Sequence, residues 1–433
     1  MTDKDLCRGL FEFIEQSPSC FHVIANLKEK LEATGFSALR ERDDWEIVAG
    51  GKYYVTRNDS SLIAFQVPEG VVKGFHMVAS HSDSPTFKIK EHPEKEAEKQ
   101  YVLLNTEKYG GMILSTWLDR PLSVAGRIVV HGKELTTKLV NIDKDLCVIP
   151  NLAIHMNPEA NKGMEYNPQV DMLPLYAGCE GAENAKDWLL EEVARAADVQ
   201  AEDILGQDLF LYVRDKGRIV GREGEFILSP KLDDLQCVYA SMEAFVQGSP
   251  KEYISLCAVF DNEEVGSGTK QGAASTFLQD VMARVCDCLP TECVMGSGKH
   301  LVNRLIADSF LISADNAHAV HPNHPEKADP TNRPYLNGGI VIKFHGGQKY
   351  TTDAVSAAKM REICKRAGVP VQTYANRSDI LGGSTLGNIS TGHVSVSSVD
   401  IGLPQLAMHS AVETAGVKDL AYAIKAFETF FQE

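Results

Sequence analysis

The sequence lacks a long apolar run: nowhere in its 433 residues do apolar residues continue for the roughly 18 positions that a membrane-spanning helix needs. The residues after Met1 also lack the basic segment and apolar stretch of a secretory signal. We therefore expect a cytoplasmic protein with no membrane partner.

Positive charge is scarce as well. Lys and Arg number 43 against 59 Asp and Glu, which gives a formal net charge of -16. Such a chain repels a phosphate backbone, so nucleic acid is not an expected partner. It also repels acidic small molecules, and an acidic substrate would need a local cation in its binding site.

Two further patterns are missing. None of the 10 cysteines forms a C-x-x-C pair, and no His stands at zinc-finger spacing from the closest cluster, Cys286, Cys288 and Cys293. We expect buried free thiols there. The glycine-rich segments 266–270 and 296–300 do not fit G-x-x-x-x-G-K-[ST], so a nucleotide-binding loop is not predicted.

The order of the predicted elements indicates an α/β fold with an insertion. A helical start and several strands lead to the charge-rich run 88–100, which is typical of a solvated crossing between domains. Short β-branched segments follow, and after residue 229 helices and strands alternate, as in a sheet with helices on both faces. We predict an α/β domain formed by residues 1–94 and 229–433 and interrupted by a β-rich domain, 95–228. The main predicted elements are two helices within 4–35, strands at 53–55, 62–65, 74–80, 254–260, 310–314 and 340–344, and helices at 182–197, 232–246, 273–288, 354–367 and from 420.

Adjacent carboxylates, Glu263 and Glu264, follow the strand predicted at 254–260. Neighbouring side chains at a strand end point in different directions, so one can hold a metal ion while the other moves a proton. A solvated acidic turn before a helix would have the same sequence.

Other candidate ligands stand at predicted element ends. His81 ends a strand, and Asp83 is well placed to accept its second imidazole N–H. His81 alone could equally be an ordinary core or surface histidine. Asp233 and Asp234, which stand where a helix is predicted to begin, could be helix-capping residues. Metal-dependent hydrolysis needs His and carboxylate ligands from several strand ends, and the chain supplies them. The remaining candidates are Asp315, which is followed by a histidine-rich loop, and His409.

Together these segments resemble the successive motifs of the aspartyl aminopeptidase (aminopeptidase I) family of dizinc exopeptidases. The resemblance runs in order from about residue 10 to the C-terminus. It is carried by His81-Ser82-Asp83-Ser84-Pro85, Leu232-Asp233-Asp234-Leu235, Asp261-Asn262-Glu263-Glu264-Val265-Gly266-Ser267, the segment 313–323 and Met408-His409-Ser410.

The resemblance implies two Zn²⁺ ions per subunit. It assigns His81 and Asp315 to one ion, Glu264 and His409 to the other, and Asp233 to a bridging position. Glu263 would be the general base. Asp234 stands where the family usually has Asn, which leaves open whether Asp233 or Asp234 bridges, and Val412 stands where an Arg is common.

The resemblance further implies a mixed zinc-exopeptidase-like sheet and an inserted dimerisation domain that delivers His155 into a neighbouring active site. Lys343 and Tyr350 would contact the substrate, with Lys343 pairing with an acidic side chain. Without the family, Lys343 would be expected to face solvent from its strand and His155 to be a surface residue. The implied assembly is a homo-oligomer whose dimers form a dodecamer.

The implied activity is release of the N-terminal residue of peptides, with preference for Asp or Glu. A zinc hydrolase acting on N-acyl or amidated small molecules would use the same ligands and differ only in its substrate pocket. A non-catalytic assembly protein would be expected to have lost ligands, and all candidates are present here. His and carboxylate ligands also accept cobalt or manganese, so zinc itself is inferred from the resemblance.

Overall fold

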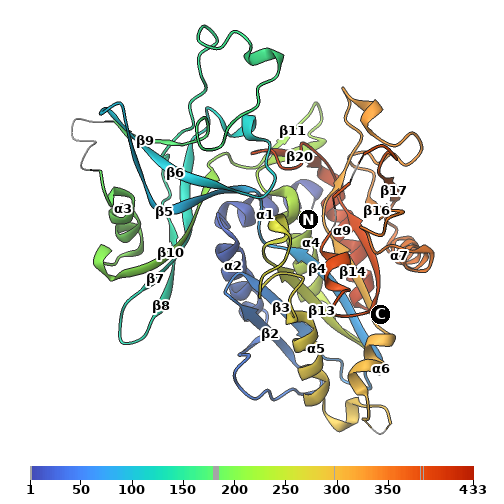
Figure 1. The fold of residues 1–433 in the computed structure, drawn as a ribbon. Helices are drawn as coiled ribbons and strands as arrows, with labels where there is room; N and C mark the ends of the chain where they lie inside the picture. The colour runs from blue at the N-terminus through green and yellow to red at the C-terminus, as the bar shows by residue number, and fades with distance from the viewer. Residues whose placement is uncertain (1, 179–184, 297, 381, 384) are drawn as a thin grey trace.

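The computed structural model describes residues 2–178, 185–296, 298–380, 382–383 and 385–433. Within them, three sheets form the framework (Figure 1). None of the helices in these residues is both long and apolar enough to cross a membrane.

A nine-stranded mixed sheet occupies the centre of the larger part of the molecule, in the order β1-β2-β3-β13-β4-β14-β18-β16-β17. β13, β4, β14 and β18 run parallel to one another, whereas β16 is antiparallel to β18. The strands are β1 (Ser37–Leu39), β2 (Lys52–Arg57), β3 (Ser61–Gln66), β4 (Gly74–His81), β13 (Tyr253–Phe260), β14 (Phe310–Ala314), β16 (Ile340–Phe344), β17 (Val371–Ala375) and β18 (Ser397–Gly402).

Helices cover both faces of this sheet. One apolar core joins it to α1, α2, α4, α7 and α9, and a second joins its other face to α5 and α6. Because both faces are covered, central strands such as β4 and β14 are buried along their whole length and do not alternate between buried and exposed residues. The helices are α1 (Asp3–Gln16), α2 (Cys20–Ala33), α3 (Trp188–Ala197), α4 (Leu232–Gln247), α5 (Phe277–Cys288), α6 (Leu301–Ala307), α7 (Ala354–Ala367), α8 (Leu386–Ser390) and α9 (Val417–Phe431).

A six-stranded antiparallel sheet lies beside this body, in the order β8-β7-β10-β5-β6-β9 (Figure 1). It has its own apolar core, over which α3 packs. The loop between β8 and β9 extends beyond the sheets at the top of Figure 1. The strands are β5 (Thr86–Ala97), β6 (Tyr101–Tyr109), β7 (Leu122–Val130), β8 (Thr136–Asn141), β9 (Leu175–Gly178) and β10 (Ile204–Val213).

The charge-rich run 88–100 is not a solvated crossing. Most of it belongs to β5, which pairs with β6 and β10, so the second sheet begins at Thr86, before the boundary expected at residue 95. Phe87 and Ile89 are buried, while Lys88 between them and Lys90 after them are more exposed. Buried apolar and more exposed charged side chains therefore alternate at the start of β5, as in a strand with one covered face, although the high charge of the segment obscures this pattern in the sequence.

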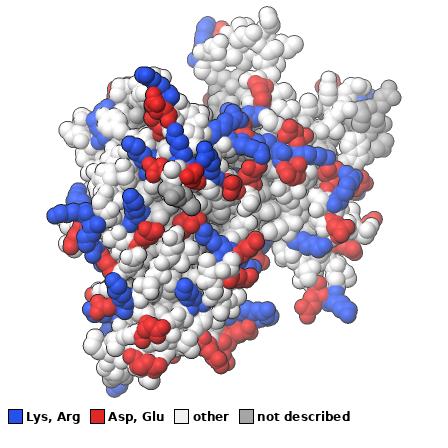
Figure 2. Space-filling view, turned by 180° about the vertical axis from the view of Figure 1, so that it is seen from behind, with Lys and Arg blue, Asp and Glu red and all other residues white. Residues whose placement is uncertain are grey.

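The remaining strands form a five-stranded sheet, β11-β12-β20-β19-β15. Because β12 pairs with β20, the end of the predicted insertion, 218–228, joins the α/β body and not the second sheet. Two helices begin later than predicted: α5 at Phe277, and α3 at Trp188, where part of the predicted helix, 182–184, lies outside the described residues. On the face in Figure 2, basic and acidic side chains are interspersed. The strands are β11 (Arg218–Val220), β12 (Phe226–Ser229), β15 (Ala317–His318), β19 (Pro404–Leu406) and β20 (Glu413–Gly416).

Candidate metal centre

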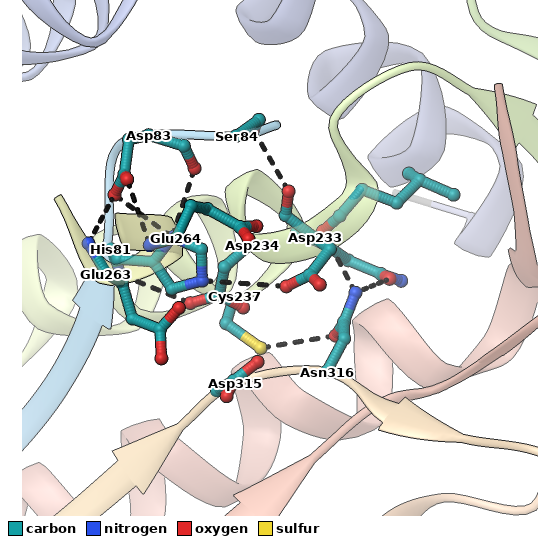
Figure 3. Close-up of polar contacts among 12 residues, drawn as sticks. His81, Asp83, Ser84, Asp233, Asp234, Cys237, Glu263, Glu264, Asp315 and Asn316 are labelled. Carbon is teal, nitrogen blue, oxygen red and sulfur yellow. Dashed lines mark hydrogen bonds and ion pairs between the residues drawn. The ribbon is translucent and has the colours of Figure 1, made fainter. Parts of the chain in front are cut away.

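Three neighbouring parallel strands bring candidate ligands to one edge of the central sheet. His81 is the last residue of β4, the Glu263–Val265 turn follows β13, and Asp315 follows β14. Since the carboxyl ends of parallel strands meet at the same edge, these side chains converge (Figure 3).

Asp233 joins them from the start of α4. Asp233 and Asp234 have non-helical dihedral angles, and both are buried. The residue before the helix is Lys231, and no side chain caps this end. The capping interpretation of the Asp pair is therefore wrong: the chain turns these carboxylates into the interior.

The converging side chains form three overlapping groups of possible metal ligands. Within each group the ligand atoms lie within 4.8 Å of one another. Asp233 belongs to two of the groups, and Asp234 belongs to none of those found in the described residues. The groups are His81, Asp233 and Asp315; Asp233, Glu264 and His409; and His81, Glu263 and Glu264.

The two oxygens of Asp233 face different histidines. Oδ1 lies 3.6 Å from Nε2 of His81, and Oδ2 lies 3.4 Å from Nε2 of His409. The same His409 nitrogen is 3.5 Å from Oε2 of Glu264. The Asp233 carboxylate thus lies between His81 on one side and His409 with Glu264 on the other, as a bridging ligand must. In contrast, an oxygen of Asp234 accepts the backbone N–H of His81.

Both histidines are oriented by backbone carbonyls. Nδ1 of His81 lies 3.0 Å from the carbonyl oxygen of Asp83, and Nδ1 of His409 lies 3.0 Å from that of Gly111. With Nδ1–H donating to these carbonyls, each Nε2 faces the carboxylates and can bind a metal ion once it has lost its proton. Asp83 was expected to perform this task with its side chain, and its carboxylate is also near, at 3.4 Å.

These residues fit zinc. Each group combines imidazole nitrogens and carboxylate oxygens, which are ligands that zinc accepts. Buried oxygens of Asp233 (Oδ1) and Glu264 (Oε1) accept no hydrogen bond from the described part of the chain. Buried polar atoms are nearly always satisfied, so a cation is the natural partner for both.

The electrostatics of the cluster are those of a site built for positive charge. Burial and the neighbouring carboxylates raise the pKa of Glu264, and burial raises the pKa of Glu263 to about 7. Although burial disfavours its charge, Asp233 and Glu264 raise the pKa of His409 to about 10. Without a cation, protons must offset the crowded negative charge.

A pocket opens beside the cluster, and Lys343 and Tyr350 line it together with His81, Asp233, Glu263 and Asp315. Lys343 is 3 % exposed, with Nζ 3.5 Å from Oδ2 of Asp315 and 5.6 Å from the centre of the Tyr350 ring. The solvent-facing interpretation of this lysine is therefore wrong, because both faces of β16 are covered.

The structure adds residues that the sequence reasoning missed and leaves one predicted residue apart. His318 and Tyr374 line the pocket, with ring centres 6.0 Å apart. The histidine-rich loop after Asp315 was the signal for His318, but nothing in the sequence distinguished it from His321 and His324, which do not line the pocket. His155 is exposed in the loop between β8 and β9 and does not line this pocket.

Comparisons with known proteins identify a family that matches almost the whole chain. Residues 13–431 match the family described as aminopeptidase I zinc metalloprotease (M18). The chain is 47% identical over 427 residues to a probable M18 family aminopeptidase 2 of Clostridium novyi, covering 98% of this chain and 97% of that protein. A similarly named Clostridium acetobutylicum protein is 48% identical over 434 residues, with 99% of each chain covered.

Solved structures of similar fold include aminopeptidase I chains. A chain in the cryo-EM structure of the Ape4 and Nbr1 complex superposes with a TM-score of 0.94 at 34% identity, over 99% of this chain and 86% of that one. The S. cerevisiae mApe1 dodecamer structure gives 0.85 at 28% identity, over 99% and 96%. The mixed α/β architecture predicted from the sequence is thus confirmed, and the chain belongs to the M18 family of aminopeptidase I zinc metalloproteases.

Proposed function

We propose that this protein is a dizinc aminopeptidase that hydrolyses the N-terminal residue of peptides and prefers Asp or Glu there. The observation that carries the preference is Lys343, a buried ammonium in the same pocket as the candidate ligands. A buried cation in a strongly acidic protein attracts a carboxylate selectively. The substrate's free N-terminal amine would lie toward the carboxylates of the cluster.

The ligand assignment follows the two groups that share Asp233. His81 and Asp315 would hold one zinc, Glu264 and His409 the other, and Asp233 would bridge them. The facing of its two oxygens toward different histidines supports Asp233 over Asp234. The chemistry supplied by bound zinc is Lewis acidity, which polarises a carbonyl and makes water nucleophilic at neutral pH.

Glu263 would serve as the general base. It lines the pocket, and burial raises its pKa to about 7, which suits a group that must both accept and return a proton. In the proposed reaction, Glu263 removes a proton from the attacking water and then delivers it to the leaving amine. The adjacent turn residue Glu264 points to His409 instead, so the pair divides the two tasks.

The test compares two substitutions in one turn. Glu263→Gln should retain zinc but lower kcat by about 100-fold or more, since general bases typically contribute about 10²–10⁴-fold. Glu264→Gln should lose zinc as well as activity. Metal content and hydrolysis of an aspartyl amide are measured for both. Substantial activity in Glu263→Gln would remove it as the base.

A hydrolase of N-acyl amino acids could use the same ligands. Its substrates carry no free N-terminal amine, so comparing peptides with their N-acetylated forms separates the two activities. Faster cleavage of the acetylated substrates would favour this alternative. Substitution of zinc by cobalt or manganese in the same assay would identify the metal that supports turnover.

We further propose that the second sheet and its loops, which make up most of the predicted insertion 95–228 together with the start of β5, act as a dimerisation unit and that dimers assemble into a dodecamer. The exposed apolar side chains of Leu152, Ile154 and Met156 flank His155 and support a role for this loop in subunit contact. The mApe1 relative is a dodecamer by its description. His155 would then enter a neighbouring site and stabilise the developing oxyanion.

Complementation tests this assignment directly. His155→Ala and Glu263→Gln chains should each be nearly inactive. If His155 acts in a partner's site, dissociating and mixing the two should restore about a quarter of wild-type activity, because half the dimers are mixed and one of their two sites is intact. No recovery on mixing would contradict it.

Cell fractionation would test the predicted cytoplasmic location.

A further inference from the structure

Tyr109, the last residue of β6, connects the second sheet to the Glu263–Glu264 turn. Its hydroxyl donates to Oδ2 of Asp83 at 2.7 Å and accepts from Nδ2 of Asn262 at 2.8 Å. Asn262 directly precedes the two glutamates. A side chain from outside the α/β body therefore holds one end of the turn that contains the proposed base.

The Asp83 carboxylate passes this contact to the glutamates themselves. Oδ1 accepts the backbone N–H of Glu263 at 3.1 Å, and Oδ2 accepts that of Glu264 at 3.2 Å, as the dashed lines in Figure 3 show. Asp83 is 4 % exposed, so these bonds are shielded from water. Tyr109 thus reaches both sides of the turn, directly through Asn262 and indirectly through Asp83.

The residues after Tyr109 contact the same centre. Gly110 has a φ of +82°, and a Cβ there would lie 3.2 Å from that of Glu264. The carbonyl of Gly111 meets Nδ1 of His409. Ile113 donates its backbone N–H to the His409 carbonyl at 3.0 Å. The segment from Tyr109 to Ile113 consequently packs on the candidate centre at several points.

We propose that Tyr109 is a positioning residue that holds the Glu263–Glu264 turn in its catalytic geometry and thereby makes the second sheet part of the catalytic machinery. This inference rests on the proposed role of Glu263. A structural role alone would require only the Tyr109 ring, which packs edge-to-face on Phe210 with centres 5.5 Å apart. The hydroxyl, in contrast, bonds Asp83 and Asn262, the two residues that hold the turn.

Tyr109→Phe isolates the hydroxyl, because the ring and its packing remain. Removing a partner of this kind typically costs about 10–100-fold in activity. We expect kcat to fall by about tenfold in zinc-saturated protein, with KM changed by less than about twofold, since the base is displaced and the Lys343 pocket is not. Zinc content and thermal unfolding are recorded in parallel.

Tyr212→Phe is the matched control. Its hydroxyl also sits in the second sheet and bonds a side chain, Asn141 at 2.8 Å, but it does not contact the turn. We expect wild-type kcat from this variant. An unchanged kcat in Tyr109→Phe, or an equal fall in the control, would overturn the inference. If Glu263→Gln is inactive in the same assay, the proposed function stands even when the Tyr109→Phe result overturns the positioning role.

A double-mutant cycle tests the route through Asp83. If Tyr109 acts through this carboxylate, Asp83→Asn should lower kcat, and adding Tyr109→Phe should lower it little further. Multiplicative effects of the two substitutions would show that they act separately and would overturn this mechanism of positioning.

Discussion

Replacing Lys343 by Met should remove the protein's preference for acidic N-terminal residues while leaving its metal centre in place. Met has a similar length and no charge, so the pocket keeps its shape. The lysine Nζ lies 3.5 Å from Asp315 and is almost fully buried, where burial disfavours its charge but Asp315 and other neighbours raise its pKa above the usual value. These neighbours favour the charged form of the lysine.

The expected size follows from this burial. Removing one member of a buried charge pair costs about 2–5 kcal/mol. For a substrate carboxylate that meets Lys343, a loss of about 3 kcal/mol corresponds to a fall of about 150-fold in kcat/KM, at about 1.4 kcal/mol for each factor of ten. Neutral substrates do not use the charge and should lose far less.

The assay measures kcat/KM for aspartyl, glutamyl, alanyl and leucyl amides at equal zinc content. Lys359→Met serves as the control, because Lys359 packs over Phe310 at the far end of β14 and does not line the pocket. Its ratio of aspartyl to alanyl rates should equal that of the wild type. If Lys343→Met retains that ratio within about twofold, the ion-pair reasoning is refuted.

Two further predictions concern protons. Burial against Tyr253 and Phe430 lowers the pKa of His76 from 6.5 to about 3, so between these values the unfolded chain binds a proton that the folded chain does not. Stability should fall as the pH falls through that window, by about 2 kcal/mol between about pH 8 and about pH 5. In urea denaturation, the free energy of unfolding of His76→Gln should fall by about 2 kcal/mol less than that of the wild type over this pH range. The same pH dependence in both proteins would contradict this. Zinc must displace protons from His409, whose pKa is raised to about 10, and from Glu264. Zinc affinity of the metal-free protein should therefore rise with pH up to about that value, with proton release measurable by calorimetry in buffers of different ionisation enthalpy; a flat affinity would contradict it.

Strands covered on both faces were the easiest part of the fold to predict, because β4 and β13 are mostly apolar and buried along almost their whole length. β5 was missed since Lys88 and its charged neighbours face outward while Phe87 and Ile89 pack inward. The strand exists because of partners far along the chain, such as β10, which pairs Phe210 with Lys88. Composition within a short window cannot reveal such pairing.

The candidate ligands were predictable because each ends a predicted element, and elements of an α/β sheet end at a common edge. The surroundings of the turn were not. Tyr109 and Gly111 contact the centre only because β6 ends beside it, and their local sequence contains no sign of this. Lys343 was misjudged without the family for a similar reason: alternation along a strand predicts an outward face, but here β16 is buried on both faces and Lys343 lines the pocket.

Anomalous diffraction at the zinc edge from crystals of the zinc-loaded protein tests the central claim most directly. The account predicts two peaks per chain, one beside His81 and Asp315 and one beside Glu264 and His409, with the Asp233 carboxylate between them. A single peak, or two peaks with Asp233 contacting only one, would contradict it.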